Sequence, residues 1–217
     1  MARLVELANI VIVPKNSPYK MLQEILEKAR AKPGAVSYES GGAGTTTHLG
    51  TVLLGVRAQA EFLHVPYKGT ALLQTVNGEV DFAIENITNV IGTIQSGAVR
   101  ALAVTSSKRL AQLPDVPTVM ESGIPDFDVT SWNGRVAPVG TPRAIIAKLE
   151  AGALEALKEP EVAARFDRAG ATVAPMGAAE FEKFYLMEIA RWAPIVKASG
   201  ARADCQQKSH NLPRSRS

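Results

Sequence analysis

The sequence has only one cysteine, Cys205, among its 217 residues, so no disulfide can form within the chain. This fits a reducing compartment, and it fits equally a periplasmic protein that does not use disulfides. The sequence also lacks an apolar run of about 18 residues, so we expect no membrane-spanning helix. Residues 1–14 make a poor signal peptide, because Glu6 and Asn9 interrupt the apolar segment and no small-residue cleavage site follows. Taken literally, the chain is not exported.

Strong charge of one sign is also missing. The formal net charge is +3 and the pI about 9.0, but lysines and arginines are spread along the chain between acidic residues. They do not alternate with aromatic residues, as a nucleic-acid-binding face would require. Hydrophobic residues make up 46% and charged residues 21%, which is ordinary for a soluble globular protein. We therefore expect no nucleic-acid partner.

The residue clusters of common catalytic and cofactor sites are scarce. The three histidines, His48, His64 and His210, have no nearby ligand partners in the sequence, so we expect no metal site. No G-x-S-x-G turn of a hydrolase occurs, and a Ser40–His48 pair would be needed for one. The glycine loop at 41–44 lacks both the third glycine of a dinucleotide fingerprint and the Gly-Lys-Ser/Thr of a P-loop. We expect no cofactor.

Hydrophobic patterning predicts alternating strands and helices, which favours an α/β fold with a largely parallel sheet. Ser17 with Pro18 is typical of a helix start, and the helix should end before Lys32. The aromatic stripe in 178–197 has helical spacing and is interpreted as core. The predicted strands are 10–13, 35–38, 61–65, 80–85, 99–104, 129–137 and 172–174; the helices include 71–76, 87–95, 119–122, 142–158, 160–169 and 178–197.

The most informative stretch is the loop from Ser40 to Thr47, SGGAGTTT. It follows a predicted strand and precedes an apolar helical pattern. Glycines let the backbone bend tightly and approach a ligand, and the first N–H groups of a helix attract anions. We expect this loop to hold a carboxylate through backbone N–H groups and through the hydroxyls of Ser40, Thr45, Thr46 and Thr47. The alternative is a glycine-rich turn with a threonine N-cap and no ligand.

Other polar residues are expected at the same edge of the sheet, because ligands bind at the carboxyl ends of parallel strands. The segment Tyr67–Thr70 follows one predicted strand. Glu85 ends another, and Asn86 is expected to cap the helix after it. Lys68 could pair with an acidic ligand or could be a solvated lysine. Trp132 could line a cleft. These groups favour a binding protein over a catalyst, since no activated nucleophile stands beside a base.

Several segments of the chain together resemble one known family. They are LEKARAKPGAVSY (26–38), SGGAGTTTHL (40–49), HVPYKG (64–69), GEVDF (78–82), RALAVTS (100–106), LPDVPTV (113–119), VTSW (129–132), APVGTP (137–142) and ARWAPIVKASG (190–200). Between residues 7 and 204 the chain is similar to the substrate-binding proteins of tripartite tricarboxylate transporters, the Bug-type extracytoplasmic solute receptors.

The resemblance implies a two-lobed, periplasmic-binding-protein-like (type II) fold whose ligand, a small di- or tricarboxylate or related acid, sits between the lobes. It implies a monomeric periplasmic receptor that serves membrane transporter subunits. The implied ligand-binding residues are Ser40, Gly41, Gly42, Ala43, Gly44, Thr45, Thr46, Thr47, Tyr67, Lys68, Gly69, Asn86 and Trp132.

The resemblance also divides the chain. Residues 1–13 correspond to a hinge strand, 14–128 to the second lobe with the ligand loop, 129–203 to the hinge return with part of the first lobe, and 204–217 to a disordered tail. Family members have about a hundred further residues before this region, so the chain resembles an N-terminally truncated receptor. We expect it to be poorly stable, to bind ligand weakly, and to expose apolar surface around Val136, Ile145 and Leu149. A non-functional fragment is the alternative function, and an α/β hydrolase a more remote one.

Overall fold

The computed structural model describes residues 2–67, 69 and 71–202. In this part of the chain seven strands form one sheet, with the order β3-β2-β4-β1-β5 and with β6 and β7 also paired to β1. The strands are β1 (Ala2–Pro14), β2 (Ser37–Ser40), β3 (Leu63–Pro66), β4 (Phe82–Asn86), β5 (Val99–Val104), β6 (Thr130–Arg135) and β7 (Ala171–Met176).

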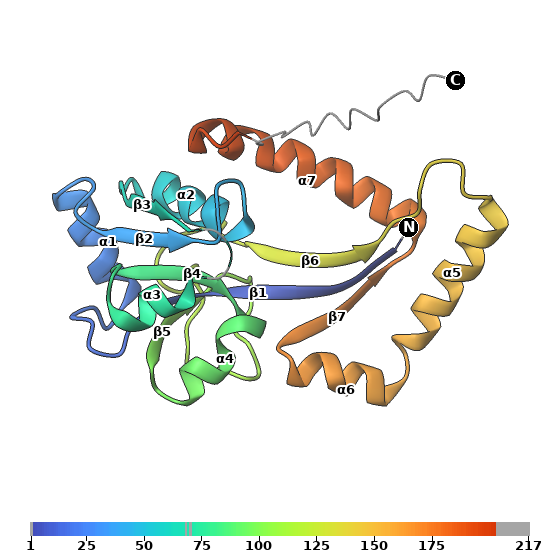
Figure 1. Cartoon of the computed structure of the whole chain (residues 1–217), viewed down its shortest axis with the longest axis horizontal. Coiled ribbons are helices and arrows are strands. Elements are labelled where there is room, and N and C mark those ends of the chain that lie inside the picture. The colour runs from blue at the N-terminus through green and yellow to red at the C-terminus, as the bar shows by residue number, and fades with distance from the viewer. Residues whose placement is uncertain (1, 68, 70, 203–217) are drawn as a thin grey trace, which may run out of the picture.

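Within the same described residues, seven helices connect or follow these strands. They are α1 (Leu22–Ala31), α2 (Thr46–Ala58), α3 (Leu72–Asn77), α4 (Ile87–Gln95), α5 (Arg143–Ala156), α6 (Pro160–Arg168) and α7 (Ala178–Ser199). Figure 1 shows β1 running through the middle of the molecule, with α1–α4 around one end and α5 and α6 around the other, while α7 runs back over β6 toward α2. No helix of the described residues is both long and apolar enough to cross a membrane.

The strand β1 organises the sheet. Its C-terminal half, from Asn9, pairs with β4 and β5, and its N-terminal half, up to Ala8, pairs with β6 and β7. All four pairings are antiparallel, whereas β2 runs parallel to both β3 and β4. The expectation of a largely parallel sheet is therefore right for β3-β2-β4 and wrong at the centre. The crossover from β4 through α4 to β5 spans β1, which lies between those two strands in the opposite direction.

Continuous apolarity in residues 10–13 has a simple cause, because both faces of this part of the sheet are covered. Side chains alternate between faces along a strand. Val11 and Val13 therefore join the core beneath α1 and α2, while Ile10 and Ile12 join the core beneath α3 and α4. All four side chains are fully buried. This two-layered core holds the edge of the sheet at which β2, β3 and β4 end.

Two local predictions were wrong. The first helix begins at Leu22 rather than Pro18, since the Glu24 carboxylate accepts the Met21 N–H at 3.0 Å and caps the start of α1. Ser17 instead accepts the Tyr19 N–H at 3.2 Å within the preceding turn. The predicted helix at 119–122 is a run of turns. The prediction of a disordered tail at 204–217 lies outside the described residues.

Candidate functional site

The loop between β2 and α2 is a strand-to-helix turn, as the sequence predicts. Gly42 and Gly44 have φ angles of +133° and +83°, which only glycine adopts without strain. Thr45 is the N-cap of α2, and its hydroxyl accepts the His48 N–H at 3.4 Å. The same hydroxyl donates to the Gly42 carbonyl at 2.8 Å. Glycine and threonine therefore shape the loop.

Several loop amides are free to receive an anion. Among the described residues, no acceptor partners the N–H groups of Ala43, Thr46 or Thr47. Ala43, Gly44 and Thr45 are exposed, and Thr46 and Thr47 are half-buried. The loop is therefore not covered by packed side chains, and the positive end of the α2 dipole faces an open region.

A second loop lies against the first one. The Tyr67 N–H donates to the Ser40 carbonyl at 3.0 Å, and the Gly69 N–H donates to the Gly41 carbonyl at 3.3 Å. The approach is close, because a Cβ on Gly41 would lie 3.0 Å from the Gly69 carbonyl oxygen. The structure thus brings Tyr67 and Gly69 to the ligand loop, while Lys68 and Thr70 lie outside the described residues.

Trp132 reaches the loop from β6. A pocket of about 490 Å³ lies between the start of α2, β6 and α7, and Gly44, Thr46 and Trp132 line it together. Trp132 also packs edge-on against Phe181 of α7, with ring centroids 5.3 Å apart. Asn86 does not line this pocket. Its side-chain oxygen accepts the Thr88 N–H at 3.3 Å and caps α4, as the sequence predicts.

The interpretation of the 178–197 aromatic stripe as core is right for Phe181, holds in part for the half-buried Phe184 and Trp192, and is wrong for Tyr185 and Ile189. Phe181 is buried, whereas Tyr185 and Ile189 are exposed and line the pocket beside Trp132. A carboxylate also lines this wall, since Glu188 accepts the Trp192 Nε1–H at 3.0 Å and pairs with Arg191 at 3.1 Å. The sequence pattern does not predict this pocket wall, because helical spacing shows that the apolar residues share one face of the helix but not which of them other elements cover.

Ser40 has a histidine partner, but it is His64 rather than His48. The Ser40 Oγ lies 2.7 Å from the His64 Nε2. Ser40 is fully buried, so a substrate carbonyl could not approach its hydroxyl. Burial, together with the nearby His48, lowers the pKa of His64 to about 4, which makes it a weak base. Within the described residues no carboxylate is hydrogen-bonded to this imidazole, so the pair does not have the geometry of a hydrolase triad.

Glu85 was considered for a cleft and instead lies in the core. It is 3% exposed and packs beside Glu39, which is fully buried at the end of β2. Burial first, and then the charge of Glu85, raises the pKa of Glu39 to about 8. Burial likewise raises the pKa of Glu85. The described residues contain no group of three or more possible metal ligands.

Comparisons with known proteins give this geometry a context. Residues 1–201 match the model of the family described as the tripartite tricarboxylate transporter family receptor. A Pseudomonas sp. (strain P51) protein encoded in the tcbD-tcbE intergenic region is 37% identical over 193 residues, which are 88% of this chain and 57% of that protein. Protein BugT of Bordetella pertussis is 36% identical over 183 residues, 83% of this chain and 56% of BugT. The chain thus spans a little over half the length of these relatives.

Solved structures agree in fold. A protein from R. palustris with adipate superposes with a TM-score of 0.84 at 29% identity, covering 92% of this chain and 67% of that one. MatC from Rhodopseudomonas palustris with bound malate gives a TM-score of 0.79 at 32% identity, covering 90% of this chain and 68% of MatC. The periplasmic binding protein BugD gives 0.81 at 30% identity, covering 93% and 69%.

Proposed function

This chain belongs to the tripartite tricarboxylate transporter receptor family, and from that premise we propose that it binds a small dicarboxylate or tricarboxylate as an extracytoplasmic solute receptor. Its structural neighbours include one protein with adipate and one with malate. The observation that carries the proposal is the open N-terminus of α2, where the amides of Ala43, Thr46 and Thr47 have no acceptor among the described residues and Thr46 lines a pocket.

Each predicted residue has a distinct role in this proposal. The amides of Ala43, Thr46 and Thr47 hold one carboxylate, and the hydroxyls of Thr45, Thr46 and Thr47 add hydrogen bonds. Gly41, Gly42 and Gly44 give the loop the shape that presents these donors. Ser40 shapes the loop from beneath. Tyr67 and Gly69 flank the ligand, Asn86 lies at the neighbouring strand end, and Trp132 provides an apolar wall. We assign Lys68 as the cation that pairs with the acid.

The proposed working arrangement is that of a two-lobed receptor. Residues 14–128 carry the ligand loop, residues 1–13 form the hinge strand, and residues 129–203 return into the other lobe. Closure of the lobes around the ligand would present the receptor to membrane transporter subunits from the periplasm. The receptor works as a monomer and performs no chemistry on its ligand.

A ligand-induced thermal shift tests the proposal. Malate and adipate at millimolar concentration should raise the melting temperature of the chain, because a ligand that binds only the folded state stabilises it by mass action. Sulfate at equal ionic strength controls for nonspecific salt effects. A cooperative melt with no shift for either acid would favour the alternative of a fragment that does not bind. An upward shift would contradict the expectation of weak binding.

Matched glycine variants test the loop itself. Gly44→Ala and Gly140→Ala impose the same strain, since φ is +83° and +89° and neither Cβ would meet an atom closer than 4.0 Å. Each should cost about 1 kcal/mol of stability. Only Gly44→Ala should also weaken malate or adipate binding, by roughly tenfold, measured by calorimetry. Equal affinities in the two variants would place the ligand elsewhere.

A further inference from the structure

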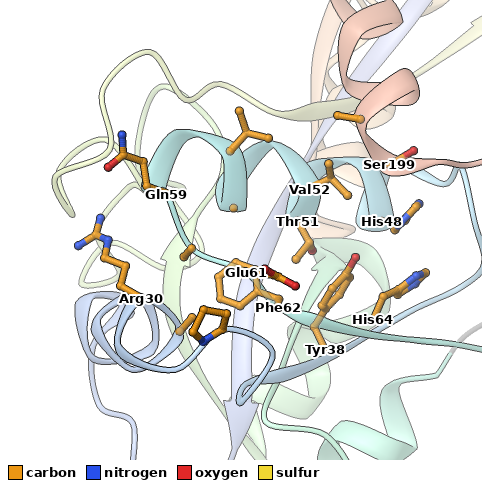
Figure 2. Close-up of a pocket in the computed structure, with 16 residues that line it drawn as sticks. Arg30, Tyr38, His48, Thr51, Val52, Gln59, Glu61, Phe62, His64 and Ser199 are labelled. Carbon is orange, nitrogen blue, oxygen red and sulfur yellow. The ribbon is translucent and has the colours of Figure 1, made fainter.

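Two histidines from the recognised motifs remain unexplained by the proposed site. His48 belongs to the segment SGGAGTTTHL and His64 to HVPYKG. Neither side chain lines the pocket beside Trp132. Both instead line a different pocket of about 590 Å³ behind the ligand loop, between α1, α2 and the end of α7. Figure 2 shows the two imidazoles next to Tyr38 at one end of this pocket.

Each histidine is hydrogen-bonded to the ligand loop from behind. The Gly44 N–H donates to the His48 Nδ1 at 3.0 Å. The His64 Nε2 lies 2.7 Å from the Ser40 Oγ, and that hydroxyl accepts the Gly42 N–H at 3.3 Å. His64 therefore contacts the start of the loop at Ser40, and His48 contacts the loop further on at Gly44. The other two glycines, Gly41 and Gly42, lie between these two contacts.

The two rings also hold each other. Their centroids are 4.2 Å apart with an interplanar angle of 14°, and the Tyr38 ring lies 4.8 Å from that of His64 at 16°. His48 and Tyr38 are each 3% exposed and His64 is half-buried, so packing holds most of this cluster in place. A buried, stacked cluster loses little additional freedom when it holds a loop, which makes it suitable for positioning.

We propose that His48 and His64 are positioning residues that hold the ligand loop in its anion-binding shape, by fixing the Gly44 amide and the Ser40 hydroxyl. This inference rests on the proposed carboxylate-binding function. Its specific content is that the His48 Nδ1 must remain an acceptor, because only an unprotonated Nδ1 can receive the Gly44 N–H. His48 then carries its proton on Nε2.

The surroundings favour the neutral form. Burial lowers the pKa of His48, and burial with the neighbouring His48 lowers that of His64. The charged and titratable groups facing this pocket are Arg30, Tyr38 and Glu61. Arg30 and Glu61 are exposed, and the Arg30 Nε donates to the Ala58 carbonyl at 2.7 Å. At a pH below both lowered pKa values, the two rings would become charged. The His48 Nδ1 would then no longer accept the Gly44 N–H, and the loop would be released.

Paired substitutions separate this role from simple packing. His48→Asn places an amide oxygen near the position of Nδ1 and cannot become charged, whereas His48→Phe keeps the ring and removes the acceptor. At pH 7 we expect His48→Phe to weaken malate or adipate binding about three- to tenfold, as for the loss of one hydrogen bond, and His48→Asn to stay close to the wild type. His64→Gln and His64→Phe provide the equivalent pair at Ser40.

A pH series adds a readout that packing alone would not change. As the pH falls through the lowered pKa of His48, the ratio of wild-type to His48→Asn affinity should fall, because only the wild type loses its acceptor. Protonation of the ligand affects both proteins equally and cancels in the ratio. A constant ratio, or equal affinities for His48→Phe and His48→Asn, would overturn the proposal.

Nuclear magnetic resonance tests the same contacts without any ligand. Imidazole ¹⁵N shifts should identify His48 as the Nε2–H tautomer at pH 7, and the Gly44 amide should exchange more slowly with solvent in the wild type and in His48→Asn than in His48→Phe. An Nδ1–H tautomer would overturn the inference. If neither acid binds the wild type, the proposed function fails, while the tautomer and the exchange rates still decide whether the histidines hold the loop.

Discussion

The two halves of β1 belong to one strand and have very different surroundings. From Ile10 to Val13 every side chain is fully buried, with helices on both faces of the sheet. From Ala2 to Ala8 the strand lies between β6 and β7, where only Val5, Leu7 and Ala171 form a small buried cluster. The ligand loop is attached to the fully covered half, which explains how a loop rich in glycine can keep a defined shape.

The helices show the same contrast. α1 and α2 bury a full apolar face, whereas α5 and α6 have no buried residue. The expected apolar surface is confirmed, because Val136, Ile145 and Leu149 are 71%, 51% and 63% exposed. A pocket of about 380 Å³ lies between α5 and the strand ends at Ala2 and Arg135. Apolar side chains are thus buried where helices cover both faces of the sheet and exposed where they do not.

The largest difference in stability between the two regions should come from truncating one isoleucine in each of them. Ile12→Ala, in the fully covered half, should cost about 2–5 kcal/mol of unfolding free energy, because a buried side chain leaves a cavity. Ile145→Ala, on α5, should cost less than about 1 kcal/mol, since its side chain is 51% exposed. Urea unfolding followed by tryptophan fluorescence measures both. Similar losses would mean that α5 is packed as tightly as the core around β1.

The contact between the two regions can be tested at Gly170. This glycine precedes β7 with φ at +80°, and a Cβ there would lie 2.9 Å from the Ile87 Cγ1 at the start of α4. Gly123→Ala is the matched control, with φ at +90° and no atom within 4 Å. Both variants share about 1 kcal/mol of backbone strain, and the clash should cost Gly170→Ala about 1–3 kcal/mol more.

The difference between these two glycine variants in chemical denaturation is the quantity to measure. If it is zero, the buried Ile87 moves aside without cost, and the two regions are packed together more loosely than the distances indicate.

A smaller effect distinguishes the buried carboxyl pair from surface acids. The pKa of Glu39 is raised from an ordinary value of 4.5 to about 8, so the folded state holds a proton that the unfolded state releases. The contribution of this group to the free energy of unfolding should be fully present below about pH 4.5. It should be lost as the pH rises from there through about 8. Glu39→Gln should flatten this decline, since an amide does not titrate.

Melting temperatures between pH 5 and pH 9 provide the measurement, with Glu61→Gln as a control on an exposed carboxylate. If Glu39→Gln and the wild type decline in parallel, the proton is not held at this pair.

Much of the fold could be predicted from local signals. The helix at 87–95 and the strand at 99–104 have the predicted bounds, because a cap at Asn86 and a turn at Ser96 with Gly97 enclose them. The extension of the first strand back to Ala2 was missed. Glu6 interrupts its apolar pattern, and the interruption makes sense only once β6 and β7 are seen on either side.

The candidate site shows the same division. The sequence pointed to the loop because glycine and threonine have local conformational preferences that need no partner. It could not show that the Ser40 hydroxyl meets His64, a residue 24 positions away in the next strand. His48 and His64 gave no ligand-like spacing in the sequence. His48 meets Gly44 only four residues away, whereas His64 reaches Ser40 and stacks on His48 only because β2 and β3 lie side by side.

The sequence by itself determined the family, the α/β order of elements and the glycine-threonine loop at a helix start, because these depend on patterns within a few neighbouring residues. The tertiary structure alone decided the antiparallel pairing of β1, the burial of Glu39 with Glu85, the exposure of Tyr185 and Ile189 on α7, and the contact of His64 with Ser40. Each of these depends on which distant segments pack together. That choice is made by the whole core and leaves no local pattern from which it could be predicted.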